Sequence, residues 1–185
     1  MRKIIALTGY SRCGKDMTAD MLKTLYEEEG KTVAIFNFSH ALKVITAKIL
    51  NITMDELEEY KNCEHIIPFG NEELTMRKIL NRISQVFKSL HGDDYFTNLV
   101  STAINDVTAD IIIITDLRYM GEYDMLKFNF YSTFNKGSFK VIRITRPHKD
   151  CKKRVADEEV DNIPYDILFT SSDIIADVKK LKEQI

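Results

Sequence analysis

The segment GYSRCGKD, residues 9–16, has the residue types and the spacing of a phosphate-binding loop. Gly9, Gly14 and Lys15 match the pattern G-x-x-x-x-G-K, directly after an apolar run and before an amphipathic one. In such a loop the glycines let backbone N–H groups point inward, the following helix adds partial positive charge, and the lysine reaches the terminal phosphates. The segment therefore predicts a binding site for a nucleotide polyphosphate. We expect it to be formed by Gly9, Ser11, Arg12, Cys13, Gly14, Lys15, Asp16 and Met17.

Asp16 stands where this pattern usually has a hydroxyl residue. A carboxylate roughly 4 Å from a phosphate charge is repelled by about 4 kcal/mol at an effective dielectric constant of about 20. A Mg²⁺ ion between the two groups removes this repulsion, and carboxylate oxygen is a ligand suited to that ion. We interpret Asp16 as a residue associated with Mg²⁺. The alternative is a solvated Asp in a first helical turn, where the helix dipole favours it.

A second polar group, Asp116 and Arg118, follows the apolar run 111–115. An acid at the carboxyl end of a parallel strand faces the crevice where doubly wound sheets bind ligands. There Asp116 could hold Mg²⁺ through water, and Arg118 could bind a phosphate group bidentately. The alternative is an Asp that caps the following helix and an exposed arginine.

Polar residues of the stretch 74–91 are candidates for binding a second substrate. Arg77 could hold a monophosphate, while Asn81 and Gln85, four residues apart on one helical face, could read a base edge. Lys43 could also reach a phosphate. A solvated polar face is an equally good interpretation of each of these residues taken alone.

Arg146 ends the apolar run 139–145 and precedes a polar stretch, 147–164, that resembles a lid. Phosphoryl transfer needs positive charge on the migrating group, so we assign the catalytic roles to Lys15, Arg118 and Arg146. Lys149, Lys152, Lys153 and Arg154 in the same stretch either assist or form a solvated charge run.

Apolar and amphipathic runs alternate along the chain, which predicts an α/β fold with helices on both faces of a parallel sheet. Five strands are expected at 4–8, 33–38, 111–115, 139–145 and 167–170. Helices are expected at 15–29, 41–50, 54–60, 74–91, 95–107 and 174–184. We interpret residues 1–39 and 109–185 as the core of one domain, residues 40–108 as a helical insertion and residues 147–164 as a short lid.

Composition excludes several classes of protein. The 185 residues suit a single domain, and 44% hydrophobic with 29% charged residues is typical of a globular chain. A formal net charge of −2 argues against a nucleic-acid binder. The first apolar run has five residues, too few for a membrane span or signal sequence. Three cysteines without metal-ligand spacing favour reduced thiols and a cytoplasmic location, in the host cell if the protein is viral.

Six motifs occur in the same order as in a known family: GYSRCGKDMTAD, MRKILNRISQ, HGDDYF, DLRYMGE, RITRP and DILFTSSDIIADVKKL. On these motifs the chain resembles phage-type deoxynucleoside monophosphate kinases of the P-loop nucleoside monophosphate kinase superfamily. The resemblance implies a P-loop kinase three-layer sandwich with strand order 2-3-1-4-5, a monophosphate-binding insertion and a lid. It also implies ATP as donor and Mg²⁺ as cofactor. By position, Lys15 and Asp16 would serve the donor and metal, Arg77 and Arg118 the acceptor phosphate, and Arg146 the lid boundary.

Three hypotheses of function follow. The first is ATP-dependent phosphoryl transfer to a deoxynucleoside monophosphate by direct in-line displacement, in a protein that acts on small nucleotides as a monomer or a homodimer. The second keeps the donor site but takes another phosphorylated metabolite, because animal-type phosphomevalonate kinases also have a G-K-D loop. The third is a non-catalytic nucleotide-binding module.

Overall fold

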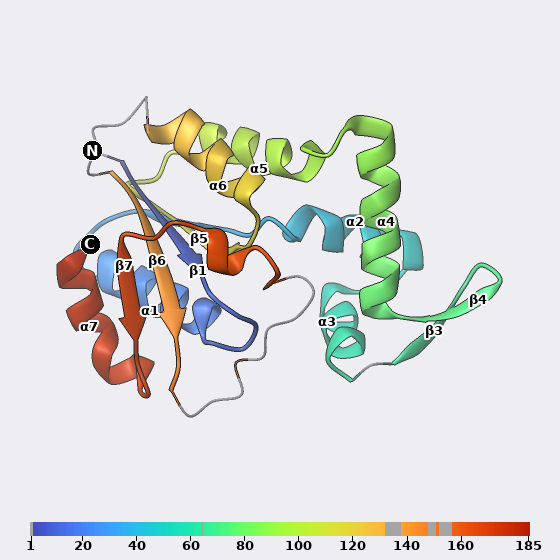
Figure 1. The fold of residues 1–185 in the computed structure, drawn as a ribbon, viewed down its shortest axis with the longest axis horizontal. Coiled ribbons are helices and arrows are strands. Elements are labelled where there is room, and N and C mark those ends of the chain that lie inside the picture. The colour runs from blue at the N-terminus through green and yellow to red at the C-terminus, as the bar shows by residue number, and fades with distance from the viewer. Residues whose placement is uncertain (1, 64, 132–137, 148–150, 152–156) are drawn as a thin grey trace. The chain divides into compact units, whose positions relative to one another are not determined.

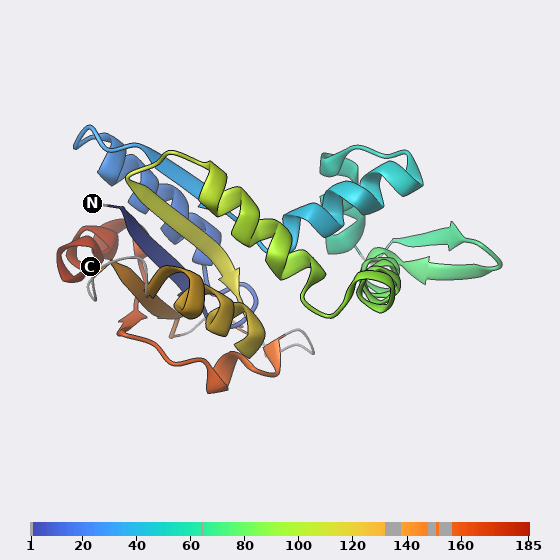
Figure 2. The same cartoon turned by 90° about the horizontal axis from the view of Figure 1, so that it is seen from above.

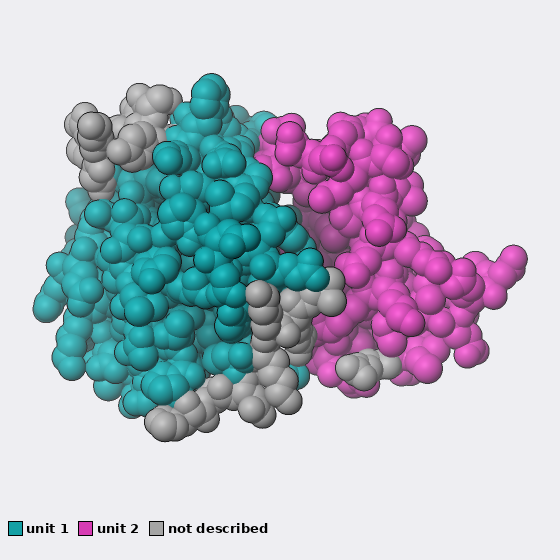
Figure 3. Space-filling model, in the orientation of Figure 1, with its two compact units in different colours: residues 1–38, 100–185 teal, residues 39–99 magenta. Residues whose placement is uncertain are grey.

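The computed structural model describes residues 2–63, 65–131, 138–147, 151 and 157–185. The chain forms two compact units: unit 1 holds residues 1–38 and 100–185, and unit 2 holds residues 39–99 (Figure 3). The helix α5 (Tyr95–Asp106) carries the chain from the second unit back into the first.

Unit 1 is built on a five-stranded sheet in which every pairing is parallel. The strands are β1 (Lys3–Thr8), β2 (Val33–Phe36), β5 (Ile111–Leu117), β6 (Phe139–Thr145) and β7 (Ile167–Thr170). They lie in the order β2-β5-β1-β6-β7 (Figure 1). Counted within this sheet alone, they are the second, third, first, fourth and fifth strands along the chain. The predicted α/β class with a five-stranded parallel sheet is confirmed.

Both faces of this sheet are covered, as the uniformly apolar strands predict. In the central strand β1, Ile5 and Leu7 face α1 (Lys15–Glu27) and α7 (Ile174–Gln184). Their neighbours Ile4 and Ala6 face α5 and α6 (Met120–Leu126), since successive strand residues point to opposite sides. Figures 1 and 2 show these two helix layers with the sheet between them. The described part of unit 1 also has two short helical segments, η1 (Lys127–Tyr131) and η3 (Val160–Asn162).

Unit 2 consists mainly of helices. They are α2 (His40–Leu50), α3 (Met54–Asn62) and α4 (Met76–His91). A hairpin of β3 (Ile66–Phe69) and β4 (Glu72–Thr75) connects α3 to α4. Leu57, Met76 and Ile79 are fully buried among these helices. The side chain of Thr53 accepts from the Glu56 amide while Glu56 binds back to Thr53, a reciprocal cap that defines the start of α3.

The hairpin is a correction to the sequence analysis, which expected a helix from residue 74. Leu74 and Thr75 instead pair with Ile67 and Ile66 across the hairpin, and α4 begins at Met76. The pairing is antiparallel and closes through Gly70, whose φ of 64° suits a tight turn. The bounds of helix α6 were also not predicted, because its seven residues are too few to show a clear helical period. Among the described residues, no helix is both long and apolar enough to cross a bilayer.

Candidate phosphate-binding site

The loop between β1 and α1 has a backbone conformation that its glycines make possible. Gly9 has a φ of 139°, and a Cβ atom placed on it would lie 2.5 Å from the carbonyl oxygen of Ile144 in β6. Gly14 has a φ of 93°, and a Cβ there would lie 2.4 Å from Cδ1 of Ile174. At Gly9 the clash is with backbone, so no other residue fits there without a shift of the loop. At Gly14 the end of the Ile174 side chain could move aside, but the positive φ still disfavours any residue other than glycine. The loop is therefore packed tightly against the sheet and α7.

Lys15 closes this loop from the inside. Its Nζ donates to the carbonyl oxygens of Gly9, at 2.8 Å, and Tyr10, at 2.9 Å, and lies 3.8 Å from Sγ of Cys13. The residue is only 6% exposed, so these acceptors compensate for the removal of its charge from water. Burial raises the pKa of the Cys13 thiol despite the nearby lysine charge, which keeps the thiol protonated at neutral pH. The loop thus encloses one positive charge.

The side chains in the first turn of α1 differ in their exposure to solvent. Thr18 is buried and donates through Oγ1 to the carbonyl oxygen of Gly14, at 2.9 Å. Asp16 and Met17, in contrast, are exposed. The Asp16 carboxylate therefore lies at the surface, on the residue that follows the loop lysine in the sequence.

Three predicted side chains lie at the carboxyl ends of neighbouring strands, as the parallel sheet requires. The loop follows β1, Asp116 lies near the end of β5 with Arg118 just beyond it, and Arg146 directly follows β6. Asp116 is buried, and its Oδ1 accepts from the Phe38 amide at 2.7 Å, so it also joins the end of β2 to β5.

Residues 118 and 119 are held by Glu122. Its Oε2 accepts from the amides of Arg118, at 2.9 Å, and Tyr119, at 3.1 Å. Burial, with a further contribution from the charge of Asp116, raises the pKa of Glu122 to about 8. The backbone that carries Arg118 is therefore anchored independently of its guanidinium group.

Asp157 is a site residue that sequence reasoning missed. The residue is fully buried, and its Oδ2 accepts from both the amide of Ser11, at 3.1 Å, and the hydroxyl of Ser11, at 2.9 Å. Its Oδ1 lies 3.6 Å from Nη1 of Arg118. The carboxylate thus joins the phosphate-binding loop to Arg118. An acid in a polar stretch gives no sequence signal of burial, so only the structure identifies it.

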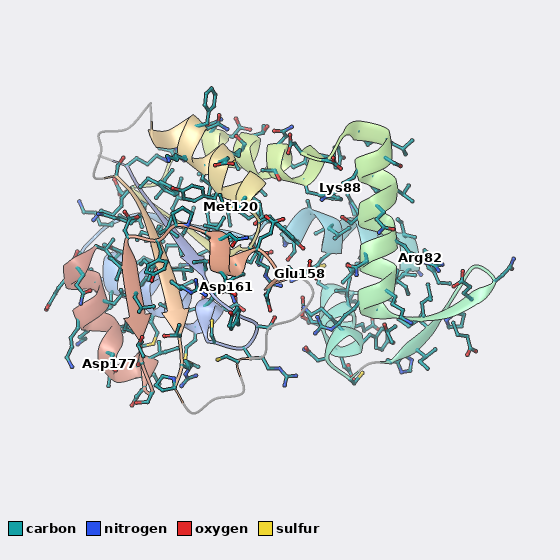
Figure 4. All side chains as sticks on the ribbon, viewed as in Figure 1. Arg82, Lys88, Met120, Glu158, Asp161 and Asp177 are labelled. Carbon is teal, nitrogen blue, oxygen red and sulfur yellow. The ribbon has the colours of Figure 1, made fainter. Side chains whose placement is uncertain are left out.

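A second acid of the same turn contacts the loop at its outer side. Asp161, labelled in Figure 4, accepts from the hydroxyl of Tyr10 at 2.7 Å and pairs with Arg143 of β6. The guanidinium carbon of Arg143 lies 5.8 Å from the ring centroids of both Tyr10 and Tyr165. Residues 157–163 are therefore bound to unit 1 at several points, with Val160 and Ile163 buried.

Arg146 lies against the loop. Its Cδ is 3.6 Å from the position of a Cβ on Gly14, and its Nη2 donates to the Ser172 carbonyl at 3.0 Å. Its buried Nε has no hydrogen-bond partner within the described part of the chain. The predicted lid of residues 147–164 stays a prediction, because Lys149, Lys152, Lys153 and Arg154 lie outside the described residues.

The remaining predicted residues belong to unit 2. Lys43 pairs with Glu58 at 2.8 Å, and Lys61 contacts the other oxygen of the same carboxylate. Burial lowers the pKa of Lys61, and the charges of Lys43 and Arg77 lower it further, while the contact with Glu58 opposes this shift. Asn81 and Gln85 are exposed one turn apart on α4. Lys61 and Glu58 had not been singled out from the sequence.

The residues fit a magnesium ion only in part. Magnesium is usually bound by one or two carboxylates together with water and substrate phosphates. The exposed carboxylate of Asp16 suits this role, whereas one oxygen of Asp116 is already committed to the Phe38 amide. No group of three or more His, Cys, Asp or Glu side chains that could hold a metal occurs among the residues described.

Comparison of the sequence with protein-family models and with curated proteins finds no significant match. Solved structures give remote likenesses. An APS kinase of Mycobacterium tuberculosis in complex with AMPPNP and APS is 16% identical, with 98% of this chain and 96% of that chain covered and a TM-score of 0.45. A shikimate kinase of Aquifex aeolicus is 13% identical, with 98% and 94% covered and a TM-score of 0.45. Similarity at this level establishes neither family nor activity, so we base the function proposed below on this chain's own residues.

Proposed function

We propose that this protein is a kinase that transfers the γ-phosphoryl group of ATP to the phosphate of a deoxynucleoside monophosphate. The observation that carries the proposal is the loop of residues 9–15, closed around the Lys15 ammonium group, with Arg146 packed on it. Inward-turned amides, a helix N-terminus and a fixed lysine are the parts that bind a polyphosphate.

The charges of unit 1 suit phosphoryl transfer. The reaction needs little covalent chemistry from the protein, so catalysis consists of alignment and charge stabilisation. Lys15 and the loop amides of Arg12, Gly14 and Asp16 would hold the donor phosphates. The Ser11 amide already donates to Asp157, and the Cys13 amide donates to the Tyr10 carbonyl. Arg146 would add charge beside Gly14, and Arg118 would bind the acceptor phosphate. The acceptor oxygen is already ionised, so no general base is needed.

A bound magnesium ion would neutralise charge on the donor phosphates. Asp16 would hold it directly, with Asp116 contributing through water. Taken by itself, unit 2 has residues suited to a nucleotide: the cations Lys43, Lys61 and Arg77 would suit a phosphate anion. Asn81 and Gln85 on the exposed face of α4 would suit the edge of a base.

The test is ADP formation with ATP, Mg²⁺ and each deoxynucleoside and ribonucleoside monophosphate, with phosphomevalonate as an additional acceptor. We expect turnover with one or more deoxynucleoside monophosphates. Turnover with phosphomevalonate alone would replace the acceptor we assign. Nucleotide binding without transfer to any acceptor would favour a non-catalytic module.

A further inference from the structure

We propose that Asp157 is a positioning residue that fixes the guanidinium group of Arg118 beside the phosphate-binding loop. The role rests on the proposed function, because Arg118 is there the group that aligns the acceptor phosphate with the donor. Asp157 itself would touch neither substrate.

The contacts of Asp157 show how it would act. One carboxylate oxygen accepts from the amide and the hydroxyl of Ser11, which lies inside the loop. The other oxygen lies 3.6 Å from Nη1 of Arg118. A single rigid carboxylate therefore spans the distance between the loop and the arginine. Movement of either partner would disturb its geometry with the other.

Burial gives this connection its strength. The side chain of Asp157 is fully buried, so its charge has lost contact with water. A buried carboxylate requires both hydrogen-bond donors and a nearby positive charge, and the two donors of Ser11 together with Arg118 supply them. The pair therefore differs from an exposed ion pair, which commonly contributes little.

Arg118 remains accessible to a ligand while it is held. Its side chain is 29% exposed, although Asp157 is not exposed at all. Its backbone amide is bound by Glu122, and its buried Nε has no hydrogen-bond partner among the residues the structure describes. Glu122 thus places the backbone, and the Asp157 contact orients the end of the side chain.

The same turn offers a matched control. Asp161 is four residues further on, but its carboxylate accepts from the hydroxyl of Tyr10 and pairs with Arg143. Its side chain is 41% exposed. Asp161→Asn therefore removes the same charge from the same turn, while leaving the Asp157 carboxylate in place.

The experiment compares Asp157→Asn with Asp161→Asn in the full chain by steady-state kinetics. Asn keeps the shape of Asp and can still accept from Ser11, but it presents no negative charge to Arg118. We expect Asp157→Asn to lower kcat/KM for the acceptor by about 10- to 100-fold, the effect of misplacing a reacting group by roughly 1 Å. The KM for ATP should change little, and Asp161→Asn should resemble the wild type. In an Arg118→Lys background, Asp157→Asn should have little additional effect.

A second measurement does not depend on activity. The Nε–Hε signal of Arg118, assigned by its loss in Arg118→Lys, should shift and exchange faster with solvent in Asp157→Asn but not in Asp161→Asn. If Asp157→Asn fails to fold, Ser11→Ala weakens the other end of the same connection and should move the Arg118 signal in the same direction.

Each result either supports or overturns the positioning role of Asp157. Equal kinetics for the two Asp variants, or a loss confined to the KM for ATP, would overturn the positioning role. So would an Arg118 signal that neither Asp157→Asn nor Ser11→Ala changes. If the wild type transfers phosphate to no acceptor, the proposed function fails, and the Arg118 signal alone then supports or overturns the positioning of that side chain.

Discussion

The ammonium group of Lys15 lies 2.8 Å from the carbonyl oxygen of Gly9, so the last residue of the candidate phosphate-binding loop binds the first. The contact turns a seven-residue segment into a closed ring with the positive charge inside. An anion that enters the ring would meet this charge together with the helix N-terminus of α1.

Lys15→Ala should abolish most phosphoryl transfer. Loss of a preorganised charge at the transferring group should lower kcat by at least about 10²-fold. Steady-state kinetics on the folded variant, checked by circular dichroism, measures the effect. Lys23→Ala on the same helix removes an exposed lysine paired with Glu27 and should leave kcat near that of the wild type. Near-normal turnover of Lys15→Ala would contradict the site.

Gly9→Ala should destabilise unit 1 more than Gly30→Ala does. Both glycines have a positive φ, 139° and 74°, so both substitutions carry backbone strain of about 1 kcal/mol. Only at Gly9 would the added Cβ meet backbone, the carbonyl oxygen of Ile144 at 2.5 Å, whereas nothing lies within 4 Å of the Cβ position at Gly30. Overpacking adds about 1–3 kcal/mol, so thermal or urea unfolding should separate the variants. Equal losses would show that the loop does not press against β6.

Asp16→Ala should weaken the dependence of activity on Mg²⁺ more than it raises the KM for the acceptor. The exposed carboxylate of Asp16, in the first turn of α1, is the described side chain best suited to hold the ion. A magnesium titration of initial rates measures the change. Asp20→Ala, one turn further along the exposed side of α1, is the matched control. An identical titration for Asp16→Ala and the wild type would remove Asp16 from the metal site.

Glu122 should make stability depend on pH. Its folded-state pKa of about 8 lies above the ordinary value of 4.5, so between these values the folded protein binds more protons than the unfolded chain. The free energy of unfolding should therefore fall as pH rises from about 4.5 to about 8 and level off above that, by a few kcal/mol at most.

The check is urea unfolding across this pH range for the wild type and Glu122→Gln. The variant cannot ionise, so its contribution to the slope should disappear, while the exposed Glu28→Gln should keep the wild-type slope. Parallel curves for the wild type and Glu122→Gln would show that Glu122 ionises normally in the folded protein.

Most strands and helices of unit 1 could be predicted from the sequence, because their residue patterns depend only on neighbouring residues. The strands at 139–145 and 167–170 and the helix at 174–184 have the predicted bounds. The hairpin of unit 2 escaped prediction because Leu74 and Thr75 also fit the helical period of the residues that follow. Val86 and Leu90 continue the apolar stripe of α4, yet they are 54% and 71% exposed. The helical period alone therefore predicts more buried residues on α4 than the structure has.

The sequence by itself determined the glycine-containing loop after the first strand and the parallel sheet, since glycine spacing and uniformly apolar runs depend only on neighbours along the chain. The tertiary structure alone decided that Asp157 binds Ser11 and that Lys43 of α2 pairs with Glu58 of α3. Such contacts join segments that are separated along the chain. They form because folding brings the segments together, and because a buried charge without a partner would cost free energy.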